Sequence, residues 1–173
     1  MSENAQLGYD ASESEAWQKL AREAATPAAE EHEVLREVLV CELGPAAYGI
    51  PVDRVREIVR LKTITPVPRV PAWVRGVIVL RGEVVQVVDM QMRLGVEPRP
   101  FDRRTRIVVL HADRERVTGV LVDAVRKVLR LPETDFRPAS GDNNFVTELC
   151  EHEGEFISIV ELEDGIEVED DDV

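Results

Sequence analysis

Residues that could carry out chemistry are few in this 173-residue chain, and they lie far apart in the sequence. The three histidines are His32 in an acidic stretch, His111 in a predicted strand and His152 between two glutamates. His111 could act as a general base, because imidazole titrates near neutral pH, and His152 with Glu151 and Glu153 could touch a metal. A lone histidine in such a setting is more often a packing or surface residue. Neither Cys41 nor Cys150 has a cysteine or histidine at ligand spacing.

Motifs of the common enzyme classes do not occur in the sequence. There is no phosphate-binding glycine loop, no dinucleotide fingerprint, no H-E-x-x-H and no G-x-S-x-G. Carboxylates are abundant and could do acid–base work, but most lie in charge-rich turns. We therefore predict that the protein is not an enzyme and holds no metal or cofactor. A small hydrolase is the enzyme alternative.

The charge of the chain is concentrated at its two ends. The formal net charge is -13, of which residues 1–33 carry -6 and residues 161–173 carry -8, which leaves +1 for residues 34–160. Terminal blocks of like charge are usually solvated, and the interspersed acids of the body argue against nucleic-acid binding. No apolar run approaches the roughly 20 residues that a membrane-spanning helix needs. With two cysteines in apolar or acidic settings, we expect reduced thiols and a cytoplasmic protein.

A phrase of 13 residues occurs twice, as residues 49–61 and 119–131, with seven identical positions. A second pair follows, residues 82–90 and 154–162. Repeats of this kind fix an architecture, so we predict two copies of one small folding unit. The predicted domain covers residues 34–166, with one half at about 35–100 and the other at about 101–166, between an acidic extension (1–33) and an acidic tail (167–173). A seam between two copies is a place where a partner can bind.

The elements that position these residues are mostly short strands. Alternating apolar residues and turn signals predict ten of them, at residues 38–43, 47–50, 58–61, 74–80, 84–89, 107–111, 117–122, 128–131, 145–151 and 156–160. Asp53 and Asp123 are each expected to open a short helix, and Asp89 to cap another that ends at Gly95. Residues 14–25 form either a helix with Ser14 as its N-cap or a disordered segment.

About five strands per copy, with a turn every 8–12 residues, predict small barrels. Each copy has near 60 residues and would be only marginally stable alone, so the two should pack together. The predicted fold class is mostly β, with two pseudo-repeated five-stranded barrels packed against each other, short helices and acidic terminal tails.

Two features of the first copy could serve either structure or binding. Glu57 and Arg81 could form an ion pair that fixes the surface at the seam, or Arg81 could be exposed to a partner. Alternatively, the two residues could make an ordinary surface salt bridge, which stabilises the fold by about 0–1 kcal/mol. Gly76 and Gly82 flank the run 77–81, where glycine indicates either barrel curvature or a flat patch on which another protein can lie.

Several segments of the chain together resemble the CheW family of chemotaxis coupling proteins. These segments are Tyr48-Gly49-Ile50, Val55-Arg56-Glu57-Ile58, Arg75-Gly76-Val77-Ile78-Val79-Leu80-Arg81-Gly82 and Val87-Val88-Asp89-Met90. The likeness runs from about residue 38 to 162 and is thinner in the second half. Val79 stands where the family motif has Asn, and Gln86 where it has Pro.

The resemblance implies two SH3-like barrels with a groove between them, and an adaptor that couples methyl-accepting receptors to a CheA-type histidine kinase. The family's receptor-binding positions correspond to Val55, Glu57, Arg75, Gly76, Val77 and Arg81, and its kinase-coupling positions to Val125 and Val128. It further implies a cytoplasmic location at receptor arrays beneath the inner membrane.

Two other functions fit the same residues. One is a CheW-like scaffold of a non-flagellar pathway for pilus motility, biofilm formation or development. The other is a tandem SH3-like module that binds a different protein. For the adaptor, we expect the substitution Gly76→Asp to abolish receptor pull-down while it leaves the fold unchanged.

Overall fold

A computed structural model describes residues 11–25, 33–111, 117–141 and 145–162 of the chain. The chain divides into two compact units, residues 1–33 and 34–173. In the first unit the described element is helix α1 (Ala11–Ala25). The structure has a helix in this segment, and α1 begins three residues before Ser14, the predicted N-cap. Trp17 and Leu20 on α1 are exposed.

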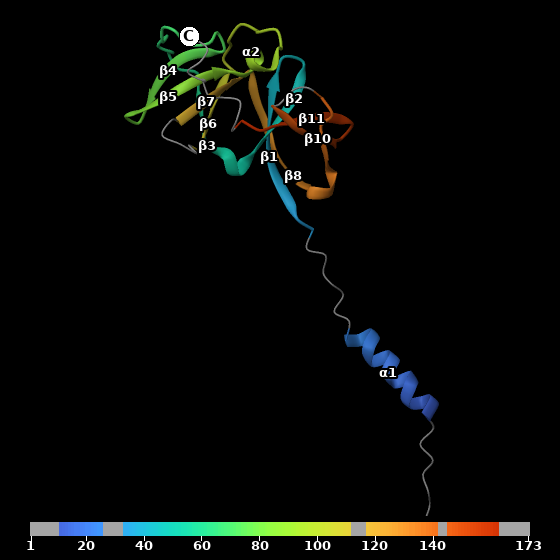
Figure 1. The fold of residues 1–173 in the computed structure, drawn as a ribbon. Helices are drawn as coiled ribbons and strands as arrows, with labels where there is room; N and C mark the ends of the chain where they lie inside the picture. The colour runs from blue at the N-terminus through green and yellow to red at the C-terminus, as the bar shows by residue number, and fades with distance from the viewer. Residues whose placement is uncertain (1–10, 26–32, 112–116, 142–144, 163–173) are drawn as a thin grey trace, which may run out of the picture. The chain divides into compact units, whose positions relative to one another are not determined.

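The described residues of the second unit form two β-sheets with three short helical turns (Figure 1). Sheet A contains, in order across the sheet, β8 (Ala124–Pro132), β1 (Leu35–Leu43), β2 (Ala46–Pro51), β11 (Glu155–Val160), β10 (Val146–His152) and β9 (Phe136–Pro138). Sheet B contains β3 (Val55–Arg60), β6 (Arg106–Leu110), β7 (Val117–Val122), β5 (Glu83–Asp89) and β4 (Val74–Leu80). The helical turns are η1 (Val52–Arg54), α2 (Met90–Leu94) and η2 (Glu133–Asp135).

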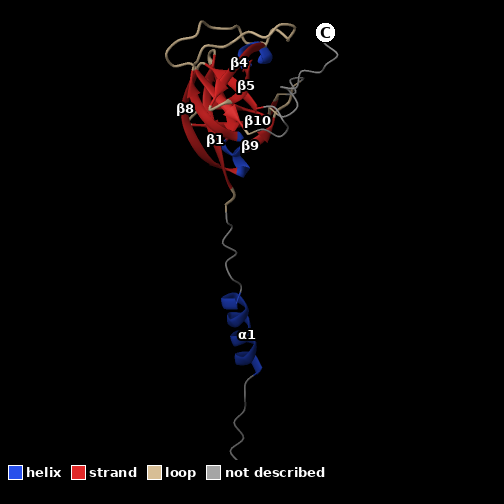
Figure 2. Cartoon of the chain, turned by 90° about the vertical axis from the view of Figure 1, so that its left-hand side faces the viewer, coloured by secondary structure: helices blue, strands red, loops and turns tan. Residues whose placement is uncertain are grey.

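All ten predicted strands are present, because the alternation of apolar residues marks each of them. The mostly β fold with two small barrels is confirmed, although sheet A has a sixth strand, β9, which is not among the ten predicted strands. Strands occupy most of the ribbon in the rotated view as well (Figure 2).

Each sheet takes strands from both sequence repeats, which the sequence did not predict. Strands β1 and β2 of the first repeat pair with β8 and β11 of the second. Strands β6 and β7 of the second repeat pair with β3 and β5 of the first. The two copies have thus exchanged their first hairpins, because the chain crosses from sheet A to sheet B at η1 and returns at Asp123. Neither barrel can form without both repeats.

Three apolar clusters fill the second unit. One lies within sheet A and one within sheet B. The third, the central cluster, combines residues of both sheets and is supplied by both repeats. Its repeat-related pairs include Ile50 with Val120, Val88 with Val160, and Met90 with Leu162. A shared core of this kind makes the two barrels one cooperative unit.

The repeated glycine at the start of the 13-residue phrase is required by close packing. A Cβ on Gly49 would lie 2.5 Å from Val38 Cγ1, and a Cβ on Gly119 would lie 2.5 Å from Ile107 Cγ2. Both glycines lie in the third strand of their sheet, between two hydrogen-bonded neighbours. A side chain there would displace the barrel core.

The short helices differ in how well the sequence predicted them. Helix α2 is confirmed, because the Asp89 side chain accepts hydrogen bonds from the backbone N–H groups of Gln91 (3.0 Å) and Met92 (3.3 Å), and Gly95 ends the helix. Asp53 lies in η1, a single turn. Asp123 opens no helix and lies in a bend, because its carboxylate accepts hydrogen bonds from two distant segments instead.

Candidate protein interaction site

The predicted Glu57–Arg81 ion pair is present, and it joins opposite edges of sheet B. Arg81 Nη2 lies 3.1 Å from Glu57 Oε2. Glu57 is on β3, whereas Arg81 lies in the two-residue loop between β4 and β5, with a φ of 51° that is typical of a type I′ hairpin turn. The Arg81 side chain is 77% exposed. The pair therefore helps to close the barrel while most of the guanidinium remains available to a partner.

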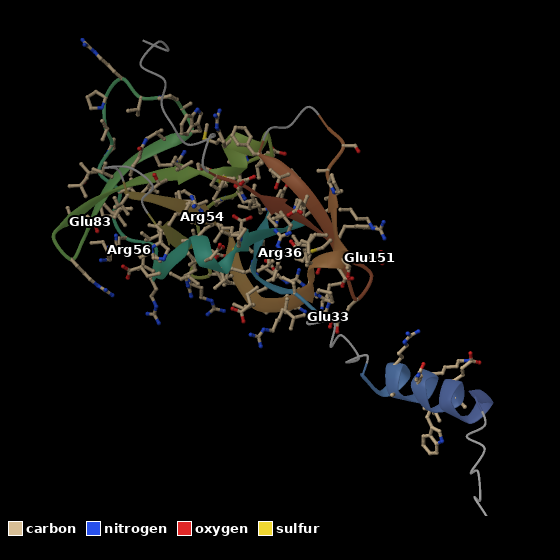
Figure 3. All side chains as sticks on the ribbon, turned by 60° about the horizontal axis from the view of Figure 1, so that its bottom comes forward. Glu33, Arg36, Arg54, Arg56, Glu83 and Glu151 are labelled. Carbon is tan, nitrogen blue, oxygen red and sulfur yellow. The ribbon has the colours of Figure 1, made fainter. Side chains whose placement is uncertain are left out.

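A second ion pair lies beside the first. Arg56 Nη2 donates to Glu83 Oε2 at 2.6 Å, and Arg56 Nε lies 3.7 Å from Glu57 Oε1 (Figure 3). The hydrogen bond to Glu83 raises the pKa of the Arg56 guanidinium. Four alternating charges thus form one rim at this end of sheet B.

The hairpin β10–β11 in sheet A repeats this arrangement, with one pair reversed in sign. Arg126 Nη1 lies 2.7 Å from Glu155 Oε1, which repeats the Arg56–Glu83 pair. Lys127 Nζ lies 3.5 Å from Glu153 Oε2, at the positions of Glu57 and Arg81. At this second pair, sheet B has the acid on the strand (Glu57) and the base in the turn (Arg81). Sheet A has the base on the strand (Lys127) and the acid in the turn (Glu153).

Each rim borders exposed apolar side chains. In sheet B, Val79 and Val84 are cross-strand partners with exposures of 63% and 60%, and Ile58 on β3 is also exposed; we call these three residues face B. In sheet A, Val128 and Phe156 are exposed by 54% and 67%; we call them face A. Ile58 and Val128 are repeat-related, as are Val84 and Phe156. Exposed apolar residues at repeat-related places make both faces candidate contact surfaces.

Gly76 is buried, and its role is to let the chain cross itself. It has a φ of 132°, and a Cβ there would lie 2.1 Å from the carbonyl oxygen of Thr65. Thr65 forms two backbone hydrogen bonds with Val77, of 2.8 and 2.9 Å. The expectation that Gly76→Asp leaves the fold unchanged is therefore wrong, because any side chain at this position collides with backbone.

The other predicted contact residues are spread over three places. Arg75 extends toward α2 and the following loop, with its guanidinium carbon 5.3 Å from the centre of the Phe101 ring. Val77 is half-buried beside Thr65. Val55 and Val125 are half-buried against the central cluster. Of the predicted residues that the structure describes, Glu57 and Arg81 are joined to each other by an ion pair.

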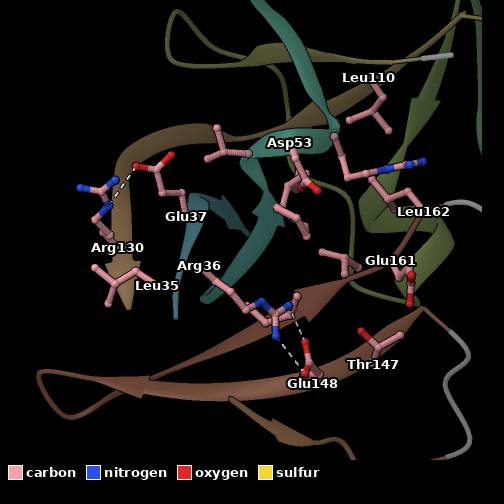
Figure 4. A pocket seen from close by; sticks show the side chains of 16 residues that line it. Leu35, Arg36, Glu37, Asp53, Leu110, Arg130, Thr147, Glu148, Glu161 and Leu162 are labelled. Carbon is pink, nitrogen blue, oxygen red and sulfur yellow. Dashed lines mark hydrogen bonds and ion pairs between the residues drawn. The ribbon is translucent and has the colours of Figure 1, made fainter. Parts of the chain in front are cut away.

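A groove of about 610 Å³ lies where sheet A meets η1 and the end of β6, and Figure 4 shows its side chains. Apolar residues of both sheets line it, among them Val52, Leu110 and Leu162. At one side Arg36 makes a bidentate pair with Glu148, at 3.1 and 2.7 Å, and this hydrogen bonding raises the pKa of Arg36. None of the predicted receptor-binding residues lines this groove.

Sequence reasoning missed a stack of three side chains next to the central cluster. The Arg93 guanidinium carbon lies 4.6 Å from the centre of the Trp73 ring and 4.3 Å from that of the Phe145 ring. Trp73 and Phe145 are repeat-related positions that directly precede β4 and β10. We call these three residues the seam stack. The repeated pair 82–90 and 154–162, extended backwards by nine residues, reaches Trp73 and Phe145, so the sequence contained a signal for this aromatic pair.

Among the residues that the structure describes, no cluster of three or more histidines, cysteines or acids could hold a metal ion. In the same part of the chain, no helix has the length and apolar character needed to span a membrane. His111 follows the end of β6 and is exposed, and His152 at the end of β10 lies 3.7 Å from Glu153. His32 lies outside the described residues.

Comparison with known proteins places the chain in a family. The family model for the CheW-like domain matches residues 37–169. The chemotaxis protein CheW of Rhizobium meliloti is 35% identical over 133 residues, which cover 74% of this chain and 85% of the relative. Protein FrzA of Myxococcus xanthus is 33% identical over 103 residues, which cover 60% of this chain and 64% of the relative.

A solved structure agrees with this match. The scaffolding protein TtCheW from Thermoanaerobacter tengcongensis superposes with a TM-score of 0.73 at 27% identity, over 82% of this chain and 94% of that one. The two exchanged barrels, the repeat and these likenesses lead to one conclusion: the chain belongs to the CheW family.

Proposed function

We propose that this protein is an adaptor that couples methyl-accepting receptors to a CheA-type histidine kinase in a signalling array at the inner membrane. Its relatives are named as chemotaxis and scaffolding proteins, which supports this role. The observation that carries the proposal is the presence of two equivalent apolar faces and a groove on one small domain. An adaptor needs at least two separate contact surfaces, and this domain offers three.

The receptor side of the adaptor would be built on sheet B and the groove. Arg81 and Glu57 offer charges at the rim of face B, and η1, which lines the groove, leads directly into β3. Val55, Gly76 and Val77 support this surface from behind, since each is at least half-buried. A helical receptor hairpin would place its tip in the groove and one flank against the rim of face B.

The kinase side would be face A on sheet A. Val128 is exposed there, whereas Val125 on the same strand is half-buried against the central cluster. An apolar face with a charged rim suits an interface of modest area in which a few residues dominate the affinity. Receptor states that differ in how they bias this assembly need a coupling free energy of only about 1–3 kcal/mol to control the kinase.

Pull-down with the full chain from a solubilised membrane fraction tests the proposal. We expect the wild-type protein to retain a methyl-accepting receptor and a CheA-type kinase. Arg81→Glu should lose the receptor, and Val128→Glu should lose the kinase. Arg137→Glu, an equally exposed charge reversal on β9, is the matched control and should retain both. Recovery of neither partner by the wild-type protein would refute the adaptor role.

A further inference from the structure

The internal repeat relates the groove to a second site where the structure shows what fills it. Two repeat-related residues, Asp89 at the end of β5 and Glu161 directly after β11, make the same backbone contact, since Asp89 N donates to Trp73 O (2.8 Å) and Glu161 N donates to Phe145 O (3.0 Å). The next residue of each repeat, Met90 or Leu162, is buried in the central cluster. The chain beyond Met90 and the groove beside Leu162 are therefore equivalent places on the two barrels.

At the first of these places, helix α2 is anchored by an amide and a carboxylate. Gln91 is buried, and its Nε2 donates to Asp123 Oδ2 at 2.6 Å. Its Oε1 accepts from Arg99 N at 2.8 Å, and the same Asp123 oxygen accepts from Gly44 N at 2.7 Å. A buried amide is stable only when its polar atoms are paired in this way. Asp123, at the crossing between β7 and β8, is thus the acceptor that seats α2.

The groove beside Leu162 has a carboxylate acceptor, Asp53, but no asparagine or glutamine is among the described residues that line it. Asp53 is the repeat equivalent of Asp123, at the crossing between β2 and β3, and it lines the groove (Figure 4). It is exposed, and no side chain or backbone N–H of the described residues donates a hydrogen bond to its carboxylate. Val52, Leu110 and Leu162 surround it with apolar surface. The volume of about 610 Å³ lies within the range of pockets that bind ligands.

We propose that the groove receives a short helical segment of the receptor that imitates α2, with an apolar side chain packed on Leu110 and Leu162 and an asparagine or glutamine side chain that donates to Asp53. This inference rests on the proposed adaptor function. The neutral amide is favoured over a lysine or arginine because an amide, that of Gln91, is the group that donates to Asp123 at the equivalent place.

Binding of the full chain to the cytoplasmic fragment of the receptor recovered by pull-down tests this inference. Asp53→Ala should weaken binding at least tenfold, because the donor loses its acceptor in a desolvated site. Asp135→Ala, which removes an exposed acid from the other single-turn helix, η2, is the matched control and should change affinity less than twofold. Thr147→Trp, which fills the groove from β10, should also abolish binding.

A double-mutant cycle between Asp53→Ala and alanine substitutions at the receptor fragment's asparagines and glutamines should locate one amide whose effect is not additive. The effect of Asp53→Ala should also change little between low and high salt, whereas pairing with a cation would be screened. A strongly salt-dependent effect would overturn the amide assignment.

The remaining outcomes separate this inference from the adaptor role. If Thr147→Trp abolishes binding and Asp53→Ala does not, the receptor binds in the groove but no receptor amide donates to Asp53, and the inference fails. If neither variant affects binding while Arg81→Glu does, the groove is not the receptor site, although the adaptor role stands. If Asp53→Ala lowers the melting temperature without changing affinity, the protein's own chain fills the groove and the inference fails.

Discussion

Substitution of Gly76 by alanine should strongly destabilise the protein. Two costs add at this position. A φ of 132° is a conformation that side-chain-bearing residues rarely adopt, and holding one there costs of order 1–3 kcal/mol. The new Cβ would also lie 2.1 Å from Thr65 O, so the two Thr65–Val77 hydrogen bonds must break, at about 0.5–1.5 kcal/mol each. We expect a total loss of about 2–6 kcal/mol.

Two other glycines separate these costs. Gly82 has a φ of 83° but open space around it, so Gly82→Ala should show the backbone strain alone, about 1 kcal/mol. Gly141 has open space and no such backbone conformation, so Gly141→Ala should be within about 0.5 kcal/mol of wild type. The measurement is urea unfolding of the three variants, with similar slopes as the condition for comparing midpoints.

The result that contradicts this reasoning is a Gly76→Ala variant as stable as Gly82→Ala. It would mean that the Thr65 segment does not cross β4 as the hydrogen bonds indicate. The same series decides how a receptor-binding defect at this position is understood. A Gly76→Asp variant that loses receptor and also unfolds early reports on the crossing, whereas one that loses receptor at full stability would make Gly76 a contact residue.

Three further predictions concern the seam, the rim and the core. Arg93→Met should lower the free energy of unfolding by about 1–3 kcal/mol, because it removes the cation from both rings of the seam stack; an unchanged urea midpoint would show that the stack contributes nothing. Arg81→Glu should cost about 1 kcal/mol, and adding Glu57→Lys should restore stability but not receptor binding; restored binding would make Arg81 a structural residue only. Burial raises the pKa of the Cys41 thiol to about 12, above its ordinary value of about 9, so the thiol stabilises the fold below pH 9 and this contribution falls as the pH rises toward 12. Wild-type stability should therefore fall faster than that of Cys41→Ala over this window, by about 1.4 kcal/mol per pH unit, and parallel curves would contradict the assignment.

Local features of the fold could be predicted from the sequence because each has a local cause. The alternation of Val and Ile marks the strands, and Asp89 with Gly95 marks both ends of α2. The Glu57–Arg81 pair was also predictable, since both residues belong to turns and strands of one repeat. These predictions need no knowledge of which strand lies beside which.

Pairing between the repeats could not be predicted for a physical reason. Equivalent strands carry equivalent apolar patterns, so a hairpin packs as well in the other copy's barrel as in its own. The groove depends on Arg36 and Glu148, which are 112 residues apart and carry no mutual signal in a single sequence. Asp53 and Asp123 occupy the same position of the repeated segment, yet of the two Asp123 accepts from an amide among the described residues, because the residues that follow each final strand differ.

Duplication gives the domain two copies of every surface, and a few side chains then make the copies different. The rims differ in the order of their charges, with Arg81 at one turn and Glu153 at the other. A partner whose charges complement the rim of face B meets like charges at two of the four corresponding points of face A, those of Lys127 and Glu153, and such juxtapositions raise the free energy of the wrong complex. Of the two equivalent aspartates at the crossings between the sheets, Asp123 binds Gln91 of α2, and Asp53 lines the groove. An adaptor that must hold two partners at once needs this kind of inequality, because identical faces would let one partner occupy both places.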